Sequence, residues 1–394
     1  MRYFVGILMI SLLVVMTIIT PSEAASLPPI SSKAAALFDL TTGEVLAGFK
    51  AEEKVYPAST TKILTALLVI ERGNLSDVVT ISSNAEHQEG TALYCKEGEE
   101  YRVKDLLHAL LVHSANDVAV ALAEYVSGSV AQFADLMNAR AKELGATNSN
   151  FVNPSGLPDE DHYTTAKDMA KIFAAAFKEP LIREITSTRV YYIDLPTGER
   201  RPLINGNKML TEYEGTLGGK TGYTRAAGNC LVTAAQAGNL KLGVALFKAQ
   251  GAAMWQDAKT LLDYGFANWS SISPIGKGRA VTAVPVRYTT ERALLVAGSE
   301  LVVIRAKQDR QLPVTWELTL NDPLQAPLTE GQVVGKVTYF LDGEPVGAVE
   351  AIVAHDVSRN WYTYWEVLLV FGFVGVAMRF INPKVSGFQS LKRR

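Results

Sequence analysis

The sequence contains little cysteine, no strong excess of charge and no internal repeats. Two cysteines in 394 residues do not make a disulfide-rich scaffold, and their spacing fits no metal site. The formal net charge is −2, with no long basic run in the body of the chain and no nucleic-acid-binding motif, so we expect no nucleic-acid partner. A composition of 48% hydrophobic and 20% charged residues excludes a disordered chain and indicates a globular one.

The two cysteines, Cys95 and Cys230, are expected to be free. Cys230 lies in the stretch 229–232, whose pattern is typical of a buried strand. An exported protein can still join two cysteines in a disulfide bond, and nothing local in the sequence requires or forbids one.

The first 24 residues have the pattern of a signal peptide. Arg2 is the only basic side chain among them, the stretch 4–19 is apolar apart from two hydroxyl residues, and Pro21 ends it. Small residues then fit a cleavage site after Ala24. The apolar run is shorter than the ~20 residues of a membrane span, which favours cleavage over an uncleaved anchor. In both cases the body of the protein is exported.

A second apolar segment predicts a single transmembrane anchor over residues 361–381. The stretch 367–378 is continuously apolar, and aromatic residues flank it as they do at membrane interfaces. The tail 382–394 is basic, and no acidic residue follows Glu366, which places the tail in the cytoplasm and the body outside the cell. A helix lying flat in the interface is the alternative, but 367–378 has no charged face to turn toward water.

Residues 25–269 predict a first domain of the α/β (α+β) class. A hairpin over 34–48 comes first, helical patterns follow, and two strands around a Gly238-Asn239 turn come after them. An amphipathic helix over 254–266 closes the domain. Strands from both ends of this region predict one sheet with helices on its faces. The other helices are expected at 59–73, 106–126, 133–144 and 166–177, and the later strands at 229–235 and 240–247.

Residues 275–357 predict a second, small all-β domain. The preceding segment, 270–278, is polar and rich in turn-forming residues, so we expect the boundary there. This region has no histidine or cysteine cluster and no catalytic motif, and we interpret it as a spacer or docking module. Its strands are expected at 281–288, 293–297, 300–305, 314–320 and 335–340.

The first of three motifs in the larger domain is Ser59-Thr60-Thr61-Lys62, at the start of an apolar helix. Residues three apart share a helix face, so the Ser59 hydroxyl and the Lys62 amine can meet. A serine hydroxyl becomes a good nucleophile when a base takes its proton, and a lysine with a lowered pKa can be that base. Alone, the motif is equally consistent with Ser59 acting as a helix N-cap.

The second motif, Ser114-Ala115-Asn116, interrupts a long apolar pattern. Ser114 can relay a proton, and the Asn116 amide can both donate and accept a hydrogen bond to hold a substrate amide. Taken alone, an ordinary polar turn between two helices explains it better.

The third motif, Lys220-Thr221-Gly222, follows two further glycines and precedes the strand at 229–235. Glycines let a ligand approach the backbone closely, and the Lys220 cation with the Thr221 hydroxyl suits a terminal carboxylate. A glycine-rich loop with a solvated lysine is the alternative. Chance occurrence of all three motifs in this order on one exported chain is improbable, so together they indicate serine acyl transfer.

The chain resembles the serine-type D-alanyl-D-alanine carboxypeptidases of the low-molecular-weight penicillin-binding proteins (peptidase S11, similar to penicillin-binding protein 5). The resemblance covers about 33–269 and includes, besides the motifs, the segments 153–158, 162–168 and 261–266. It implies a penicillin-binding/β-lactamase-like transpeptidase fold, with an antiparallel sheet and helices on both faces. The β-rich region and the C-terminal anchor fit the same family.

The resemblance also implies the role of each motif residue. Ser59 is expected to be the acyl-ester nucleophile and Lys62 its general base. Ser114 is expected to relay a proton, with Asn116 beside it in the catalytic site. The expected substrate-binding residues are Lys220, Thr221, Gly222 and Tyr223, the last through a backbone N–H that shares an oxyanion hole with that of Ser59.

The implied reaction removes the terminal D-alanine from the stem pentapeptide of peptidoglycan through an acyl-enzyme. The implied partners are a stem peptide ending in D-Ala-D-Ala, β-lactams as covalent inhibitors, and the bacterial membrane, with the catalytic domain facing the cell wall. No cofactor or metal is implied.

Two positions depart from the commonest wording of the family motifs, and two other functions stay open. Ala115 stands where glycine is usual, and Tyr223 stands where histidine is common; either can change substrate preference or deacylation rate.

A class A-like β-lactamase would need a glutamate that activates water, and Glu160 is the nearest candidate. A catalytically silent wall-binding scaffold could keep the fold, but here all the expected side chains are present.

Overall fold

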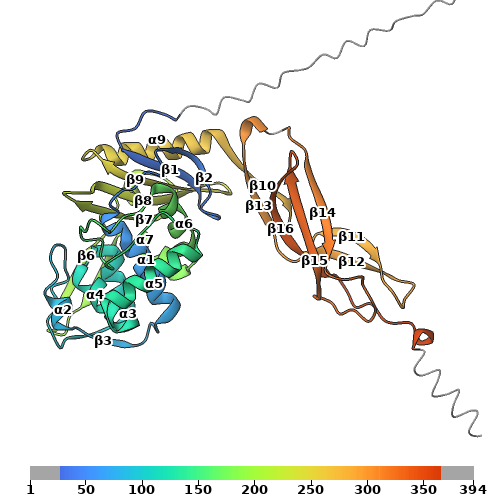
Figure 1. Ribbon diagram of the computed structural model, residues 1–394, viewed down its shortest axis with the longest axis horizontal. Coiled ribbons are helices and arrows are strands. Elements are labelled where there is room, and N and C mark those ends of the chain that lie inside the picture. Colours follow the sequence, from blue (N-terminus) through green and yellow to red (C-terminus); the bar gives the residue numbers. More distant parts are fainter. Residues whose placement is uncertain (1–26, 310, 365–394) are drawn as a thin grey trace, which may run out of the picture.

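The computed structural model describes residues 27–309 and 311–364. These residues form a helix-and-sheet part and an elongated all-β part, which are joined through α9 and β10 (Figure 1). The predicted signal peptide, 1–24, and most of the predicted anchor lie outside the described residues. Within the residues that the structure describes, no helix is long and apolar enough to cross a membrane.

The first part is built on a five-stranded antiparallel sheet in the order β2-β1-β9-β8-β7. The first two strands come from the start of the chain and the other three follow some 165 residues later, which confirms the prediction of one sheet made from both ends. Its strands are β1 (Ala34–Asp39), β2 (Val45–Phe49), β7 (Thr216–Thr224), β8 (Gly228–Ala237) and β9 (Leu240–Ala249).

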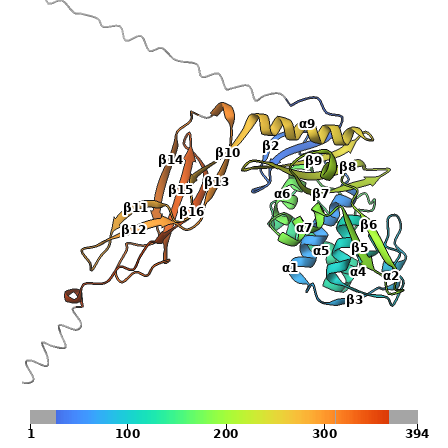
Figure 2. The same cartoon turned by 180° about the vertical axis from the view of Figure 1, so that it is seen from behind.

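Helices cover both faces of this sheet, as expected. On one face, α9 (Ala253–Asn268) packs Leu261 and Leu262 against a buried cluster that includes Leu37 and Leu242 (Figures 1 and 2). The short α8 (Met209–Glu212) lies on the same face as α9, where Met209 joins this cluster and Glu212 pairs with Lys259. The other face carries a larger core and the other helices. They are α1 (Lys62–Arg72), α2 (Ser83–Glu86), α3 (Val103–His108), α4 (Asn116–Ser127), α5 (Val130–Glu143), α6 (Ala166–Ala176) and α7 (Pro180–Ser187).

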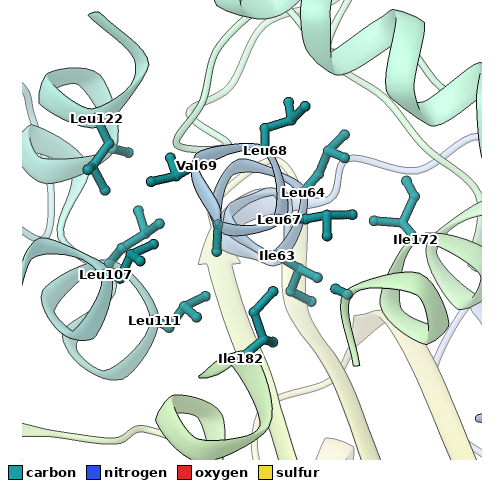
Figure 3. Packing of buried hydrophobic residues seen from close by; sticks show 14 of the residues in the cluster. Ile63, Leu64, Leu67, Leu68, Val69, Leu107, Leu111, Leu122, Ile172 and Ile182 are labelled. Carbon is teal, nitrogen blue, oxygen red and sulfur yellow. The ribbon is translucent and has the colours of Figure 1, made fainter. Parts of the chain in front are cut away.

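Helix α1 runs through the middle of the larger core. Its side chains from Lys62 to Val69 are all buried, which is the pattern of a central rather than a surface helix. Figure 3 shows α1 end on, with Leu64 and Leu67 toward Ile172 of α6 and Val69 toward α3 and α4. Lys62, the residue that begins α1, is therefore held in place by the packing of the buried stretch 62–69.

The predicted helix over 106–126 is broken where the second motif begins. After α3 the chain makes a π-helical turn, η2 (Ala109–His113), and Ser114 then adopts a left-handed conformation with φ +70°. α4 starts two residues later. π-turns of this kind are frequent at functional sites. Cys95 and Cys230 are both buried and free, as expected.

The third motif lies in a strand, which the sequence analysis did not expect, and this excludes the alternative of a glycine-rich loop with a solvated lysine. Residues Lys220, Thr221 and Gly222 belong to β7 and pair with Val232, Leu231 and Cys230 of β8. Glycines are uncommon inside strands and often mark a close approach of another backbone. A Cβ atom on Gly222 would lie 2.8 Å from the backbone nitrogen of Ser59. The glycine therefore lets β7 lie against the nucleophile segment.

Two smaller two-stranded sheets complete the first part. The hairpin β5–β6 is fastened to the helices by His108 and Tyr191, whose rings stack 3.8 Å apart. The strands are β3 (Val78–Thr80) with β4 (Glu100–Arg102), and β5 (Val190–Asp194) with β6 (Arg200–Ile204).

The second part is all β, with a five-stranded sheet in the order β11-β12-β16-β15-β14. Strand β10 (Trp269–Ile275) occupies the segment that the sequence suggested as a turn-rich boundary. This strand forms because it pairs with β13 and buries Ile275 in the core of the all-β part. The other strands are β11 (Ala280–Pro285), β12 (Arg292–Ala297), β13 (Leu301–Ala306), β14 (Val314–Leu320), β15 (Val333–Leu341) and β16 (Glu344–Val353). Short 3-10 turns are η1 (Ala58–Thr61), η3 (Lys307–Asp309) and η4 (Trp361–Thr363).

Candidate active site

Ser59 and Lys62 are brought together by the 3-10 turn η1 that leads into α1. Side chains three residues apart eclipse each other in a 3-10 helix, more closely than in an α-helix. The Ser59 Oγ and the Lys62 Nζ lie 2.9 Å apart. The predicted nucleophile and base are therefore in hydrogen-bond contact.

Lys62 is completely buried and has three oxygen neighbours. Besides Ser59 Oγ, its Nζ lies 2.7 Å from Asn116 Oδ1 and 2.7 Å from the carbonyl oxygen of Ser155. Burial lowers the pKa of Lys62 well below its usual range, the charge of Lys220 lowers it further, and Asp117 opposes these two effects. The surroundings therefore favour the neutral amine, which can accept a proton.

Asn116 begins α4 and is held from both ends of its side chain. Its Oδ1 accepts from Lys62, and its Nδ2 donates to the carbonyl oxygen of Glu89, 2.6 Å away. Its backbone N–H donates to the carbonyl oxygen of Thr91. These contacts fix the amide so that its oxygen faces the buried lysine.

Ser114 lies two residues before Asn116 in the chain and is not hydrogen-bonded to Ser59, Lys62 or Asn116. The residue is half-buried, and within the described part of the chain its hydroxyl makes no hydrogen bond. Its left-handed backbone at the end of η2 redirects the chain into α4. The structure thus brings Ser59, Lys62 and Asn116 into direct contact and leaves the Ser114 hydroxyl available.

Strand β7 supplies the opposite wall. Lys220 is only 2% exposed, and burial lowers its pKa to about 7. Its Nζ donates to the carbonyl oxygen of Thr221 at 2.9 Å, whereas the half-buried Thr221 hydroxyl makes no hydrogen bond within the described residues. Tyr223 follows Gly222 on the same edge strand and is 67% exposed. A cation and a hydroxyl are therefore placed together on this wall.

The loop 153–158 holds Lys62 through a backbone carbonyl, a role that sequence reasoning missed. Asn153 Oδ1 accepts hydrogen bonds from the N–H groups of Ser155 and Gly156, which folds a tight turn and points the Ser155 carbonyl at Lys62. Gly156 has φ +84°, and a Cβ atom there would lie 1.8 Å from the carbonyl oxygen of Ala58. The segment was noticed for its family resemblance, but only the fold shows its contact with the lysine.

His162 is a second residue whose role was not predicted from the sequence; it supports the turn η1 through a hydrogen bond to Thr61. Its Nδ1 accepts from the Val152 N–H at 3.1 Å, so its Nε2 carries the proton and donates to Thr61 Oγ1 at 2.9 Å. Burial lowers the pKa of His162 to about 4, which keeps the ring neutral near neutral pH. The ring therefore acts as a fixed hydrogen-bond donor under the nucleophile turn.

The site can perform nucleophilic catalysis with a serine and a lysine base. Within the described residues, no group of three or more histidine, cysteine, aspartate or glutamate side chains is placed to hold a metal ion. Glu160 is exposed and is not among the neighbours of Lys62. It does not occupy the place that a water-activating glutamate would need.

This fold, together with the contact between Ser59 and Lys62 beside a Lys-Thr-Gly strand, defines a class: the serine enzymes that recognise penicillin. The chain belongs to the D-alanyl-D-alanine carboxypeptidase family, peptidase S11, whose model matches residues 21–251. Residues 269–359 match the model of the penicillin-binding protein 5 C-terminal domain. The chain is accordingly a serine D-Ala-D-Ala carboxypeptidase of the penicillin-binding protein 5 type.

Three similar proteins show how far this relationship extends. D-alanyl-D-alanine carboxypeptidase DacF of Bacillus subtilis is 34% identical over 83% of this chain and 86% of its own length. DacB2 of Mycobacterium tuberculosis is 35% identical over 63% of this chain and 87% of its own length. The crystal structure of penicillin-binding protein 5 from Haemophilus influenzae superposes with a TM-score of 0.70 at 30% identity, and covers 85% of this chain and 99% of that structure.

Proposed function

We propose that Ser59 is the nucleophile that forms an acyl-enzyme with a stem peptide ending in D-Ala-D-Ala, and that Lys62 is its base. The single observation that carries this assignment is the 2.9 Å contact between the two side chains in a buried setting. A neutral lysine amine has two N–H groups and one lone pair. The Ser155 carbonyl and Asn116 Oδ1 can only accept, so they take the two N–H groups. The lone pair is left for the Ser59 hydroxyl proton.

Lys220 and Thr221 bind the terminal carboxylate of the peptide in this proposal. Both side chains lie on β7, directly before the Gly222 that contacts the nucleophile turn: Thr221 is one residue before it and Lys220 is two. The Lys220 ammonium attracts the carboxylate, and the Thr221 hydroxyl donates to it. The backbone N–H groups of Ser59 and Tyr223 stabilise the oxyanion that forms on attack.

In the proposed reaction, these groups pass the Ser59 proton to the leaving amine and return to their starting states. The Ser59 proton moves to Lys62 as Oγ attacks the carbonyl of the penultimate D-alanine. The proton then passes through Ser114 to the leaving amine, which departs as free D-alanine, and an ester remains on Ser59. Water, deprotonated by Lys62, hydrolyses the ester and restores the enzyme. A β-lactam acylates Ser59 in the same way, but its leaving group stays attached, so it persists as an inhibitor.

We further propose the domain organisation and location that the sequence predicts. Residues 1–24 are a signal peptide, 25–269 the catalytic domain, 275–357 the β-rich domain, 361–381 a membrane anchor and 382–394 a basic cytoplasmic tail. The catalytic domain then faces the cell wall from outside the membrane. Apolarity and charge in the two terminal segments support this arrangement.

Two measurements on one preparation test the proposed chemistry. The protein is incubated with a peptide ending in D-Ala-D-Ala and the free D-alanine is quantified; in parallel it is exposed to penicillin and its peptides are analysed by mass spectrometry. We expect D-alanine release and one adduct, on the peptide containing Ser59, and neither with Ser59→Ala. An adduct on another residue would refute the nucleophile assignment, and rapid turnover of penicillin would favour a β-lactamase.

A further inference from the structure

The all-β part ends in a cluster of exposed aromatic residues, which we call the aromatic end. It lies away from α9 and the helix-and-sheet part, beside η4 (Figures 1 and 2). Trp361 is 76% exposed, Tyr362 52%, Tyr288 42% and Tyr364 38%, and the Trp361 and Tyr362 rings meet edge to face. Surfaces of soluble proteins rarely gather large apolar side chains in this way, so the cluster indicates a contact with another protein or a membrane.

The base of the aromatic end is a packed structure made from three segments that are distant in the chain. The loop between β11 and β12 is bonded to the loop between β14 and β15, because the Arg287 N–H donates to the Leu324 carbonyl at 2.9 Å. The backbones of Leu328 and Val357 exchange two hydrogen bonds, which join the second loop to the segment after β16. Leu324, Leu328 and Val357 are buried in the core of the all-β part. The rings therefore stand on a fixed base.

Arg359 joins rings from two of these segments. Its guanidinium lies 4.5 Å from the centroid of the Tyr288 ring and 4.2 Å from that of the Tyr364 ring. The Tyr288 carbonyl also accepts from the Asn360 N–H at 2.8 Å. Tyr288 belongs to the β11–β12 loop, far from the other rings in the chain, so folding alone places it in the cluster.

The guanidinium of Arg359 keeps one amino group free. Its Nε donates to Thr363 Oγ1 at 3.0 Å and its Nη2 to the Thr363 carbonyl at 2.6 Å, whereas among the described residues its Nη1 makes no hydrogen bond. A guanidinium is weakly hydrated, and its N–H groups match a phosphate. Tyrosine and tryptophan rings beside such a cation are typical of protein surfaces in the headgroup region of a membrane.

The other charges at this end favour a neutral lipid surface over an anionic one. The charged side chains of the three segments are Arg287, Arg359, Glu291, Asp322, Glu330 and Asp356. Four carboxylates against two guanidinium groups would repel an anionic surface. Contact with a zwitterionic lipid then depends on the rings and on the Arg359 guanidinium, and not on net charge.

We infer that the aromatic end is a docking surface for the headgroup region of a zwitterionic lipid membrane, and that Tyr288 touches this membrane. The inference rests on the proposed membrane anchor, 361–381, which begins in the same segment. The anchor alone attaches the all-β part at one point of the chain. The β11–β12 loop adds a second point of contact, which limits the tilt of the all-β part on the membrane.

A fluorescent reporter beside Tyr288 tests this docking in the full chain. Thr290→Cys, on the same loop, is labelled with an environment-sensitive dye, and the protein is reconstituted into phosphatidylcholine vesicles that contain a lipid with a nitroxide at headgroup depth. Cys95 and Cys230 are buried, so the dye reacts at position 290. Thr197→Cys, exposed between β5 and β6, is the matched control.

We expect the dye at position 290 to emit at shorter wavelength in vesicles and to be quenched by the nitroxide lipid, and the dye at position 197 to show neither effect. Adding Tyr288→Ser should lower the ratio of docked to undocked protein, obtained from the quenching, about two- to fivefold, and Tyr288→Phe should retain it. High salt should leave the quenching unchanged, because net charge does not drive the contact. Release of D-alanine from a soluble peptide should be equal in all variants, which checks their folding.

The possible failures are distinguishable. A wild-type chain that the vesicles do not retain would overturn the proposed anchor and this inference together. Retention without quenching at position 290, or with quenching that Tyr288→Ser leaves unchanged, would overturn this inference alone. A wavelength shift that grows with the protein-to-lipid ratio, without nitroxide quenching, would also overturn it and would assign the aromatic end to contact between two copies of the chain.

Discussion

At the scale of single residues, the proposed mechanism needs two buried lysines, Lys62 and Lys220, in opposite charge states. Lys62 must be neutral to accept the Ser59 proton, and Lys220 must be charged to hold the carboxylate. Burial lowers both pKa values, and the charge of Lys220 helps to keep Lys62 neutral. In the proposed mechanism, the buried Lys220 cation therefore both binds the substrate and lowers the pKa of the base.

This division predicts a bell-shaped pH dependence of kcat/KM. Activity should rise with pH as Lys62 loses its proton, and fall above about pH 7 as the free enzyme loses the charge on Lys220. The test is kcat/KM against pH for a D-Ala-D-Ala peptide. In Lys220→Arg the guanidinium stays charged, so a folded variant with residual activity should lose the basic limb. A basic limb unchanged in that variant would show that another group causes it.

Sequence patterns identified the side chains of the site but not the backbone groups that orient them. Ser59, Lys62 and Asn116 are recognisable because their chemistry is carried by residue type. The Ser155 carbonyl that receives a Lys62 hydrogen bond could belong to any residue, so no pattern marks it. The fixed tautomer of His162 likewise depends on Val152 and Thr61, which only folding brings to it.

At the scale of elements, helices and hairpins were predictable where periodicity is strong, whereas several strands were not, β7 and β10 among them. No strand was expected at the third motif because its glycines lower strand propensity, yet β7 forms since β8 pairs with it. Gly222 leaves the space that the nucleophile turn occupies. β10 looked like a boundary because its serines are polar, but its partner β13 lies about 30 residues away. Strand pairing decided both cases, with the next strand for β7 and with a distant one for β10.

The 153–158 loop provides a test of how elements support the site. Gly156 and Gly198 have the same φ of +84°, but a Cβ atom at 156 would meet the Ala58 carbonyl at 1.8 Å, whereas at 198 nothing lies within 4 Å. Both changes to alanine should cost about 1–2 kcal/mol for the left-handed backbone. Gly156→Ala should cost roughly 1–3 kcal/mol more and slow acylation, because η1 must shift.

Denaturant unfolding and the rate of penicillin labelling measure these two effects. Gly198→Ala, at a hairpin tip, serves as the control for backbone strain alone and should label at the wild-type rate. Equal destabilisation of the two variants, with equal labelling, would show that the loop and the nucleophile turn are not in the tight contact described.

At the scale of the whole molecule, α9 and β10 connect the two parts and a few contacts fasten them. Trp269 and Ile304 pack on the same core as α9, and Lys307 Nζ donates to the Phe266 carbonyl at 2.8 Å. None of these residues lies near Ser59 in the chain or shares its hydrogen bonds. The all-β part therefore supports the outer face of the sheet rather than the catalytic groups.

This arrangement predicts that a chain of residues 25–268 folds and keeps its chemistry. We expect D-alanine release from a soluble peptide within about threefold of the longer chain, since distant sites act independently. The melting temperature should fall by several degrees, because the apolar contacts of Trp269 and Ile304 on α9 are lost. A folded truncated protein that no longer releases D-alanine would show that the all-β part shapes the active site.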